Sequence, residues 1–338
     1  MKEFIQKLVE GKDLSELEAE EAMGIVMTGN ATQAQIGAFL TALRMKGETV
    51  DEITAFARIL RKFSTKVRPK VKGTLVDTCG AGGDISGTFN ISTVASFVAA
   101  GAGVPIAKHG NRFVSSKSGS ADVLEALGVK IDLEPEEVER CIEKAGIGFI
   151  FAPKYHTAMK YAIGPRKELG IRTVFNVLGP LISPAEVKAQ VYGVYDAGLT
   201  EKLIQVLKKL GSERAMVVHG MDGLDEISTL GKTRISELDR GKIRTHHVEP
   251  SDFNLKKARL SDLTGEGPDQ NAEITLNILG GEKGPRRDIV ILNAAAAIAV
   301  GGLSRDIKGA LGLAEKSIDS GEAMEKLQKL ISISNGRY

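Results

Sequence analysis

An alternation of short apolar runs and helical segments after Pro69 limits the possible folds more than any other feature of the sequence. The apolar runs lie at residues 73–78, 104–108, 147–151, 189–195 and 215–219. The helical segments lie at residues 93–100, 121–127, 135–144 and 287–300. This alternation is typical of a mostly parallel central sheet flanked by helices. Ligands of such sheets bind at the carboxyl ends of the strands, so we expect the chemistry in the loops that follow them.

The N-terminal part follows a different pattern. Three helices are each opened by a capping box, in which a hydroxyl residue precedes Glu or Gln by three positions: Ser15 with Glu18, Thr32 with Gln35, and Thr49 with Glu52. Apolar residues follow at helical spacing. We therefore predict a small all-helical domain at residues 1–68, joined by part of 160–184. A larger α/β domain is predicted at residues 73–338.

Charge and composition argue against several classes of protein. The 45 basic and 43 acidic residues give a net charge of +2, without the basic excess of a dedicated nucleic-acid binder. No apolar run is long enough to span a membrane, and the N-terminus lacks a signal-peptide core. Cys79 and Cys141 match no metal-ligand spacing and are expected to be reduced thiols. We expect a cytoplasmic protein that binds neither nucleic acid nor membrane.

A glycine-rich loop and a helix follow the first predicted strand, at residues 77–93. Its glycines allow backbone N–H groups to face an anion, and the following helix directs its N-terminal dipole to the same place. A dinucleotide fingerprint and a Walker P-loop both fail, because Ile85 and Thr88 stand where they require Gly and Lys. Asn90, Ser92 and Thr93 add hydrogen-bonding groups, and any of them is a candidate helix cap. The pattern indicates a phosphate-binding loop.

A second polar loop at residues 108–120 combines basic side chains, four serines and two glycines, with Ser120 as the expected cap of the next helix. Two such loops at strand ends predict a ligand with phosphates at both ends. A third loop carries adjacent carboxylates, Asp225 and Glu226, which suit a hard cation such as Mg²⁺. Such a pair is usually solvated surface when it stands alone, but a diphosphate ester is commonly held by a divalent metal.

A fourth loop at residues 151–159 places His156 after a predicted strand, with Arg166 and Arg172 downstream. Arg166 is able to form a bidentate pair with a carboxylate. A lone His is more often structural, and a lone Arg is more often a surface charge, so this loop alone leaves its role open.

Together the four loops resemble those of the anthranilate phosphoribosyltransferase family over nearly the whole chain. The resemblance is carried by CGAGGD at 79–84, NIST at 90–93, KHGNR at 108–112, SSKSGSAD at 115–122, Arg166, NVLGP at 176–180, and Asp225 with Glu226. It implies a homodimer formed through the helical domain. It also implies transfer of the phosphoribosyl group from phosphoribosyl pyrophosphate (PRPP) to the amine of anthranilate, with Mg²⁺, as the second step of tryptophan biosynthesis from chorismate.

The resemblance also assigns residues to ligands by position. PRPP would be bound by Gly80, Gly82, Gly83, Asp84, Thr88, Asn90, Ile91, Ser92, Thr93, Lys108, Asn111, Ser116 and Ser120. Anthranilate would be bound by Gly80, His109, Asn111, His156, Arg166 and Gly179, and the metal by Ser92, Asp225 and Glu226. Two departures from the family are Ala81, where Thr is common, and Thr157, where Pro is common.

The implied reaction needs little acid–base chemistry, because an aromatic amine is already uncharged at neutral pH. We therefore predict no obligatory catalytic base, with His109 as a weak candidate for a late proton acceptor. The nearest alternative enzyme is a pyrimidine nucleoside phosphorylase, which would not need the paired acids and would cleave uridine or thymidine with phosphate. A non-catalytic relative that binds nucleic acid is a second alternative.

Overall fold

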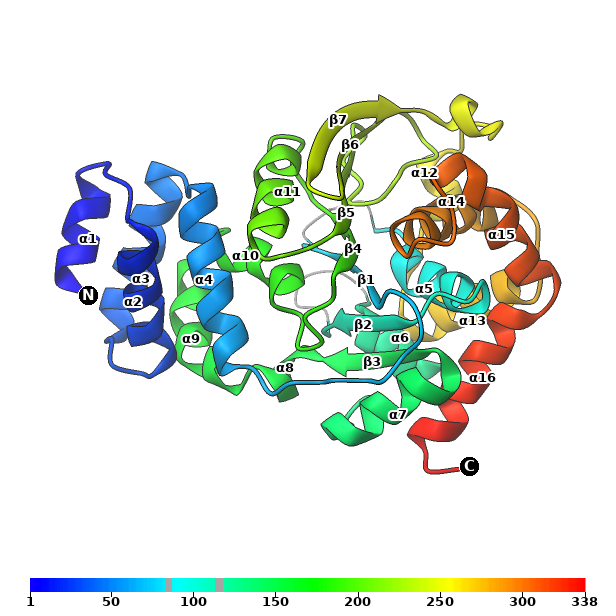
Figure 1. The fold of residues 1–338 in the computed structure, drawn as a ribbon, viewed down its shortest axis with the longest axis horizontal. Coiled ribbons are helices and arrows are strands. Elements are labelled where there is room, and N and C mark those ends of the chain that lie inside the picture. Colours follow the sequence, from blue (N-terminus) through cyan, green and yellow to red (C-terminus); the bar gives the residue numbers. More distant parts are fainter. Residues whose placement is uncertain (83–86, 113–117, 338) are drawn as a thin grey trace.

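The computed structural model describes residues 1–82, 87–112 and 118–337. Its centre is a seven-stranded sheet with the order β3-β2-β1-β4-β5-β6-β7 (Figure 1). The strands are β1 (Val76–Gly80), β2 (Ile106–Gly110), β3 (Ile147–Phe151), β4 (Ala189–Gly193), β5 (Arg214–Gly220), β6 (Thr233–Asp239) and β7 (Lys242–Val248). The first five run parallel, which confirms the mostly parallel sheet. The first two begin two or three residues later than predicted.

The sheet ends in an antiparallel hairpin that the sequence analysis did not predict. Strands β6 and β7 pair along their whole length and are joined by Arg240 and Gly241. Both turn residues have positive φ, 45° and 82°, as the two-residue turns of tight hairpins require. Polar residues on both strands hide the apolar alternation, and β7 lies at the edge of the sheet.

The predicted helices of the α/β domain correspond to α5 (Ile91–Gly101), α6 (Ser120–Ala126), α7 (Pro135–Ala145) and α14 (Pro285–Val300). Further long helices are α11 (Leu199–Lys209), α13 (Pro268–Leu279), α15 (Ile307–Asp319) and α16 (Glu322–Ser334). Short turns of helix are α8 (Ala152–Tyr155), α10 (Phe175–Leu178), α12 (Leu260–Leu263), η1 (Thr157–Met159), η2 (Gly179–Ile182) and η3 (Pro250–Phe253). None of the described helices is long and apolar enough to cross a membrane.

The expected cap of α6 was wrong by one position. Gly119 occupies the N-cap, and Ser120 is already helical. The reason is the carboxylate of Asp122, which accepts the N–H of Gly119 at 2.8 Å and closes the first turn.

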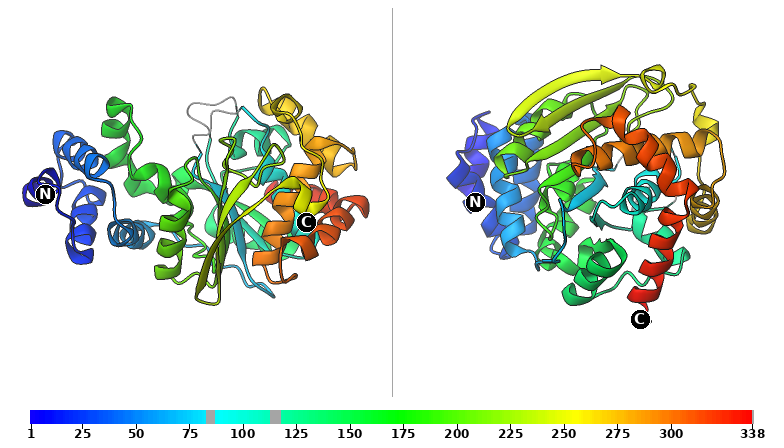
Figure 2. Two further views of the ribbon diagram at one scale, coloured as in Figure 1. Left: turned by 90° about the horizontal axis from the view of Figure 1, so that it is seen from above. Right: turned by 45° about the vertical axis from the view of Figure 1, so that its right-hand side comes forward.

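The N-terminal residues form a group of four helices, which confirms an all-helical unit but adds one helix to the predicted three. The helices are α1 (Lys2–Val9), α2 (Glu16–Met27), α3 (Gln33–Lys46) and α4 (Val50–Phe63). The three predicted capping boxes are all present, at the starts of α2, α3 and α4. Helix α9 (Lys160–Leu169) packs against α2 and α3 from a later part of the chain. The group lies at one end of the molecule, away from the C-terminal helices (Figure 2).

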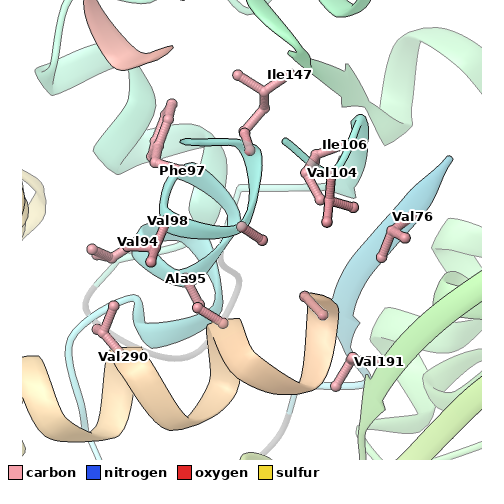
Figure 3. Packing of buried hydrophobic residues seen from close by; sticks show 14 of the residues in the cluster. Val76, Val94, Ala95, Phe97, Val98, Val104, Ile106, Ile147, Val191 and Val290 are labelled. Atoms are coloured by element: carbon pink, nitrogen blue, oxygen red, sulfur yellow. The ribbon is translucent and has the colours of Figure 1, made fainter. Parts of the chain in front are cut away.

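The sheet separates two apolar clusters because alternate side chains of a strand point to opposite faces. Val191 of β4 joins a cluster with α5 and α14, whereas Tyr192 joins a cluster with α11 and the N-terminal helices. Figure 3 shows part of the first cluster around α5, including Val94, Val76 and Val290. This packing places the start of α5 and the middle of α14, at Asn293, beside the carboxyl ends of the central strands.

Candidate active site

The candidate site lies where the connections of the sheet change direction. From β1 the chain continues outward to β2 and β3, and it returns to β4 on the other side of β1. Such a switch point leaves a crevice at the carboxyl ends of the two strands. Gly80 and Gly193 pair in register at these ends. A Cβ at Gly80 would lie 2.6 Å from Oδ2 of Asp225, and one at Gly193 would overlap the carbonyl oxygen of Asp225. The two glycines thus leave the space that the acidic loop fills.

The acidic loop is held from two sides. Oδ2 of Asp225 accepts the backbone N–H of Gly82 at 3.2 Å. On the other side, the buried side chain of Asn293 in α14 accepts the N–H of Ile227 and donates to its carbonyl, both at 2.9 Å. The sequence analysis missed Asn293, although a single amide within the apolar stretch ILNAAAAIAV was a usable signal.

Ser92, Asp225 and Glu226 line one small pocket together with Thr78, Cys79 and Gly80. A hydroxyl and two carboxylates are oxygen ligands, which Mg²⁺ prefers over nitrogen or sulfur. Within residues 1–82, 87–112 and 118–337, no group of three or more His, Cys, Asp or Glu could hold a metal by itself. The donor set therefore fits an ion that keeps several waters or substrate oxygens.

Lys108 enters this pocket region from β2 and is buried. Its Nζ donates to the carbonyl of Thr78 at 2.7 Å and lies 3.4 Å from Oγ of Ser92. Burial lowers the pKa of Lys108 because the charged form loses its hydration. An anionic ligand beside the ammonium group would oppose that shift.

Asp77, which the sequence analysis did not select, supports the end of β2. Strands β1 and β2 pair in register at Val76 and Ile106. Toward their carboxyl ends, the two strands are joined by the side chains of Asp77 and Lys108. Oδ1 of Asp77 accepts the N–H of His109 at 3.1 Å. Burial raises the pKa of Asp77 to about 7, against the opposing charge of Lys108. A carboxylate within an apolar strand was the signal for this residue.

The structure brings His109 and His156 together. Their Nε2 atoms lie 3.2 Å apart, and the rings meet edge to face with centroids 5.1 Å apart. Burial lowers the pKa of His109 to about 3 and that of His156 to about 4, while the backbone of Gly179 acts on His109 in the opposite direction. Both rings are therefore neutral at pH 7, so one donates a hydrogen bond and the other accepts it.

Arg166 lies on α9 with its Cζ 5.0 Å from the ring centroid of Phe175. Burial lowers the pKa of its guanidinium. Among the described carboxylates none forms an ion pair with Arg166, so its charge is not neutralised by this part of the chain. Phe175 begins α10, and Gly179 directly follows this helix, so Arg166 is linked through α10 to the residue beside His109.

The remaining predicted residues lie around the two polar loops. Thr88 pairs with Thr264, and Ile91 and Thr93 are buried in the first turn of α5. Asn111 is exposed after β2, and its carbonyl accepts from Oγ of Ser120 at 3.4 Å. No described contact joins Asn111 to Arg166. Gly83, Asp84 and Ser116 lie outside the described residues.

The candidate caps of α5 do not cap it through their side chains. Asn90 occupies the N-cap position without a side-chain cap hydrogen bond. Its amide instead donates to the carbonyl of Ser118 at 3.1 Å, which joins the glycine-rich loop to the serine loop.

Family models match both parts of the chain. The helical bundle domain of the glycosyl transferase family matches residues 2–64, and the a/b domain of that family matches residues 72–324. The fold and the phosphate-type loops thus define a glycosyl transferase with an N-terminal helical bundle.

Individual proteins narrow this assignment. The chain is 56% identical to the anthranilate phosphoribosyltransferase of Acetivibrio thermocellus, over 99% of this chain and 97% of that protein. It is 55% identical to that of Moorella thermoacetica, over 98% of each. The crystal structure of the Thermus thermophilus enzyme matches with a TM-score of 0.93 at 40% identity, covering 98% of this chain and 99% of that one.

The chain belongs to the anthranilate phosphoribosyltransferase family, as the resemblance predicted. It is therefore a glycosyltransferase of tryptophan biosynthesis, and the two alternative functions are set aside. A structure of the Saccharomyces cerevisiae enzyme in complex with PRPP and Mg matches with a TM-score of 0.90 at 29% identity. The match covers 99% of this chain and 97% of that one.

Proposed function

We propose that this chain binds PRPP across its two polar loops and transfers the 5-phosphoribosyl group to the amine of anthranilate, giving N-(5-phosphoribosyl)anthranilate and pyrophosphate. The observation that carries the proposal is the pocket at the switch point, where Ser92 and the Asp225–Glu226 pair meet beside buried Lys108. The direct test follows anthranilate fluorescence after mixing with PRPP, with and without Mg²⁺. A Mg²⁺-dependent decrease with release of pyrophosphate is expected. No decrease, with PRPP still bound, would exclude anthranilate as the acceptor.

Ser92, Asp225 and Glu226 are the proposed metal ligands, directly or through water. When bound, Mg²⁺ neutralises negative charge on the pyrophosphate leaving group. Lys108 would face the same oxygens, whereas the N–H groups of Ala81 and Gly82 already donate to the Gly193 carbonyl and to Asp225. Asp84 and Ser116, outside the described residues, are proposed PRPP contacts from the resemblance alone.

The metal assignment is tested by Asp225→Asn and Glu226→Gln. Each change removes a negative oxygen ligand, so the Mg²⁺ concentration needed for half-maximal rate should rise at least about tenfold. Glu273→Gln is the matched control, because Glu273 is an exposed carboxylate on α13. Unchanged Mg²⁺ dependence in both acidic-loop variants would remove these residues from the metal site.

Arg166 is the proposed partner of the anthranilate carboxylate, because its half-buried charge has no carboxylate partner among the described residues and its guanidinium lies over the ring of Phe175. A planar guanidinium matches a carboxylate with two parallel hydrogen bonds. Arg166→Lys should raise the KM for anthranilate by about tenfold or more and leave the KM for PRPP nearly constant. The exposed neighbour Lys167→Ala serves as the control. Equal KM values for anthranilate in both variants would contradict the assignment.

The reaction is proposed to need no obligatory general base. The amine attacks uncharged, and the neutral His109–His156 pair lines the approach of anthranilate and holds its orientation. With pKa values of about 3 and 4, the two rings are poor proton acceptors at pH 7. His109→Ala should therefore alter anthranilate affinity more than the maximal rate. A rate loss of about 10²–10⁴-fold at constant affinities would instead identify a general base.

We further propose a homodimer through the helical domain, to which α9 contributes from the 160–184 segment. Support comes from large apolar side chains exposed on these helices: Val9, Leu17, Met45 and Ile163. Leu17 is 79% and Met45 84% exposed in one chain. Sedimentation should give twice the chain mass of 36.1 kDa, and Leu17→Glu or Met45→Glu should shift it toward one mass. A monomeric wild type would refute the dimer.

The free cysteines Cys79 and Cys141 support a cytoplasmic location.

A further inference from the structure

A segment from the C-terminal third of the chain docks on the exit of the glycine-rich loop. The N–H of Phe89 donates to the carbonyl of Leu263 at 3.0 Å, and the N–H of Gly265 donates to the carbonyl of Gly87 at 3.0 Å. Thr88 and Thr264 form an antiparallel bridge between these two bonds. The approach is close, because a Cβ at Gly265 would lie 2.9 Å from Cα of Phe89. The loop that precedes α5 is therefore held by backbone from residues 263–265.

The same segment leads into α13, whose first turn carries Asn271. This side chain is 2% exposed, and its Nδ2 donates to Oδ1 of Asn90 at 3.0 Å. The other end of the Asn90 amide donates to the carbonyl of Ser118 at 3.1 Å. Because a carbonyl oxygen only accepts, the bond to Ser118 fixes which way the Asn90 amide points, and its Oδ1 is left facing Asn271. The hydrogen bonds from Asn271 to Asn90 and from Asn90 to Ser118, which we call the amide relay, thus join three segments that are far apart in sequence.

Helix packing holds the segments of the amide relay together. Helix α13 packs against both α5 and α6, the two helices that begin where the glycine-rich and serine loops end, and it lies beside α5 in the overall view (Figure 1). A ligand with phosphates at both ends needs these two loops at a fixed separation. Packed helices and buried hydrogen bonds are the means by which a protein fixes such a separation before binding.

We propose that Asn271 is a positioning residue for PRPP, which acts through Asn90 to hold the two phosphate-binding loops at the separation that the substrate requires. The inference rests on the proposed assignment of both loops to PRPP. Loss of the Asn271 donor leaves Oδ1 of Asn90 with the longer, 3.4 Å contact from Oγ of Ser118. The Asn90 amide then gains rotational freedom, and the loops lose their common anchor.

The test is a double-mutant cycle on kcat/KM for PRPP with Asn271→Ala, Asn90→Ala and the double variant. Asn271→Ala should raise the KM for PRPP by roughly 3- to 10-fold, as expected for one net hydrogen bond, and leave the KM for anthranilate unchanged. In the double variant, kcat/KM should equal that of Asn90→Ala alone, because the second change has nothing left to act through. Additive losses would overturn the proposal.

Thr275→Val is the matched structural control. Thr275 is buried in the same helix and donates to the backbone carbonyl of Asn271 at 2.7 Å, so its loss perturbs α13 without removing the amide. Thermal unfolding is measured for each variant, and the isosteric Asn271→Asp replaces Asn271→Ala if the latter does not fold. An equal rise in the KM for PRPP in Thr275→Val would reduce Asn271 to a structural role and overturn the proposal.

The outcomes also separate this inference from the proposed function. If Asn90→Ala weakens PRPP binding but Asn271→Ala does not, the loops bind PRPP and the positioning role of Asn271 is refuted. If Asn90→Ala leaves the KM for PRPP unchanged, the assignment of the loops fails and the inference fails with it.

Discussion

Gly193→Ala offers a direct test of the geometry at the switch point of the sheet. A Cβ at Gly193 would overlap the carbonyl oxygen of Asp225 and lie 2.7 Å from its carbonyl carbon, where ordinary contacts begin at 3.4 Å. The carbon must therefore move by at least 0.7 Å, and the oxygen must move further. Because the clash is with backbone, no side-chain rotation relieves it. The φ of Gly193 is not among the positive values, so lack of space is the obstacle to alanine.

The expected effect follows from this displacement. Overpacking of a well-packed position costs about 1–3 kcal/mol of unfolding free energy. A shift of about 1 Å in a residue that positions reacting groups costs on the order of 10²-fold in rate. We expect Gly193→Ala to fold, to need at least about tenfold more Mg²⁺, and to lose about 10²-fold in kcat/KM for PRPP. The assays are the Mg²⁺ titration of the anthranilate fluorescence decrease and urea denaturation.

Two other glycines calibrate this result. At Gly80, a Cβ would meet Oδ2 of Asp225 at 2.6 Å, and this side chain is able to rotate, so Gly80→Ala should cost less unfolding free energy than Gly193→Ala, although rotation of a proposed metal ligand still raises the Mg²⁺ requirement. At Gly312, an exposed position within α15, no atom lies within 4 Å, and Gly312→Ala should gain about 0.5–1 kcal/mol with unchanged activity. If Gly193→Ala retained the wild-type rate and Mg²⁺ dependence, the position of Asp225 would not matter for catalysis and the reasoning would be refuted.

Three further predictions concern residues that hold the site or the fold. Asn293→Ala removes both hydrogen bonds to the backbone of Ile227. The Mg²⁺ requirement should therefore rise roughly tenfold, while the KM for anthranilate stays constant. An unchanged Mg²⁺ titration would contradict a role of Asn293 in holding the acidic loop. Because burial holds the pKa of His109 and His156 at about 3 and 4, below the ordinary 6.5, the folded chain binds fewer protons than the unfolded chain in this interval. The unfolding free energy should therefore fall as the pH drops from about 6.5 toward 4. In urea denaturation, His156→Asn should show a shallower fall of the unfolding free energy with pH. The same pH dependence in wild type and variant would contradict a buried, neutral His156. Glu52 is fully buried, accepts the N–H of Leu14 at 2.9 Å and pairs with Lys46 at 2.9 Å. Glu52→Ala should therefore lower the unfolding free energy by about 3–5 kcal/mol in a urea titration. Glu21 is exposed, so the control Glu21→Ala should leave the unfolding free energy nearly unchanged.

The sequence was most informative where structure depends on near neighbours. Capping boxes join residues three positions apart, and all three predicted boxes are present. The apolar strands were also found, because central strands of a parallel sheet are apolar on both faces. The β6–β7 hairpin was missed, since an edge strand exposed to solvent, such as β7, carries too few apolar residues to show its period.

The same distinction applies to the site. Residues that would touch ligands, such as Lys108 in β2 and Ser92 in the first turn of α5, lie next to loops with a recognisable composition. Residues that hold them do not, because their partners are distant in sequence. Asp77 meets His109 across 32 positions, Asn293 meets Ile227 across 66, and Asn271 meets Asn90 across 181. No local pattern reports such pairs, and they become visible only when the strands and helices are packed.

Asn271 and Asn293 share a chemical property that explains their place beside the loops. An amide both donates and accepts, and it stays uncharged at every pH at which the protein is folded. Asn293 uses both functions on the backbone of Ile227, next to the paired carboxylates. A carboxylate at 293 would lose the donor and add a third negative charge near Asp225 and Glu226. A lysine or arginine there would compete with a metal for these oxygens. Neutral amides from α13 and α14 therefore fix the loops without altering the charge balance that a metal and a pyrophosphate require.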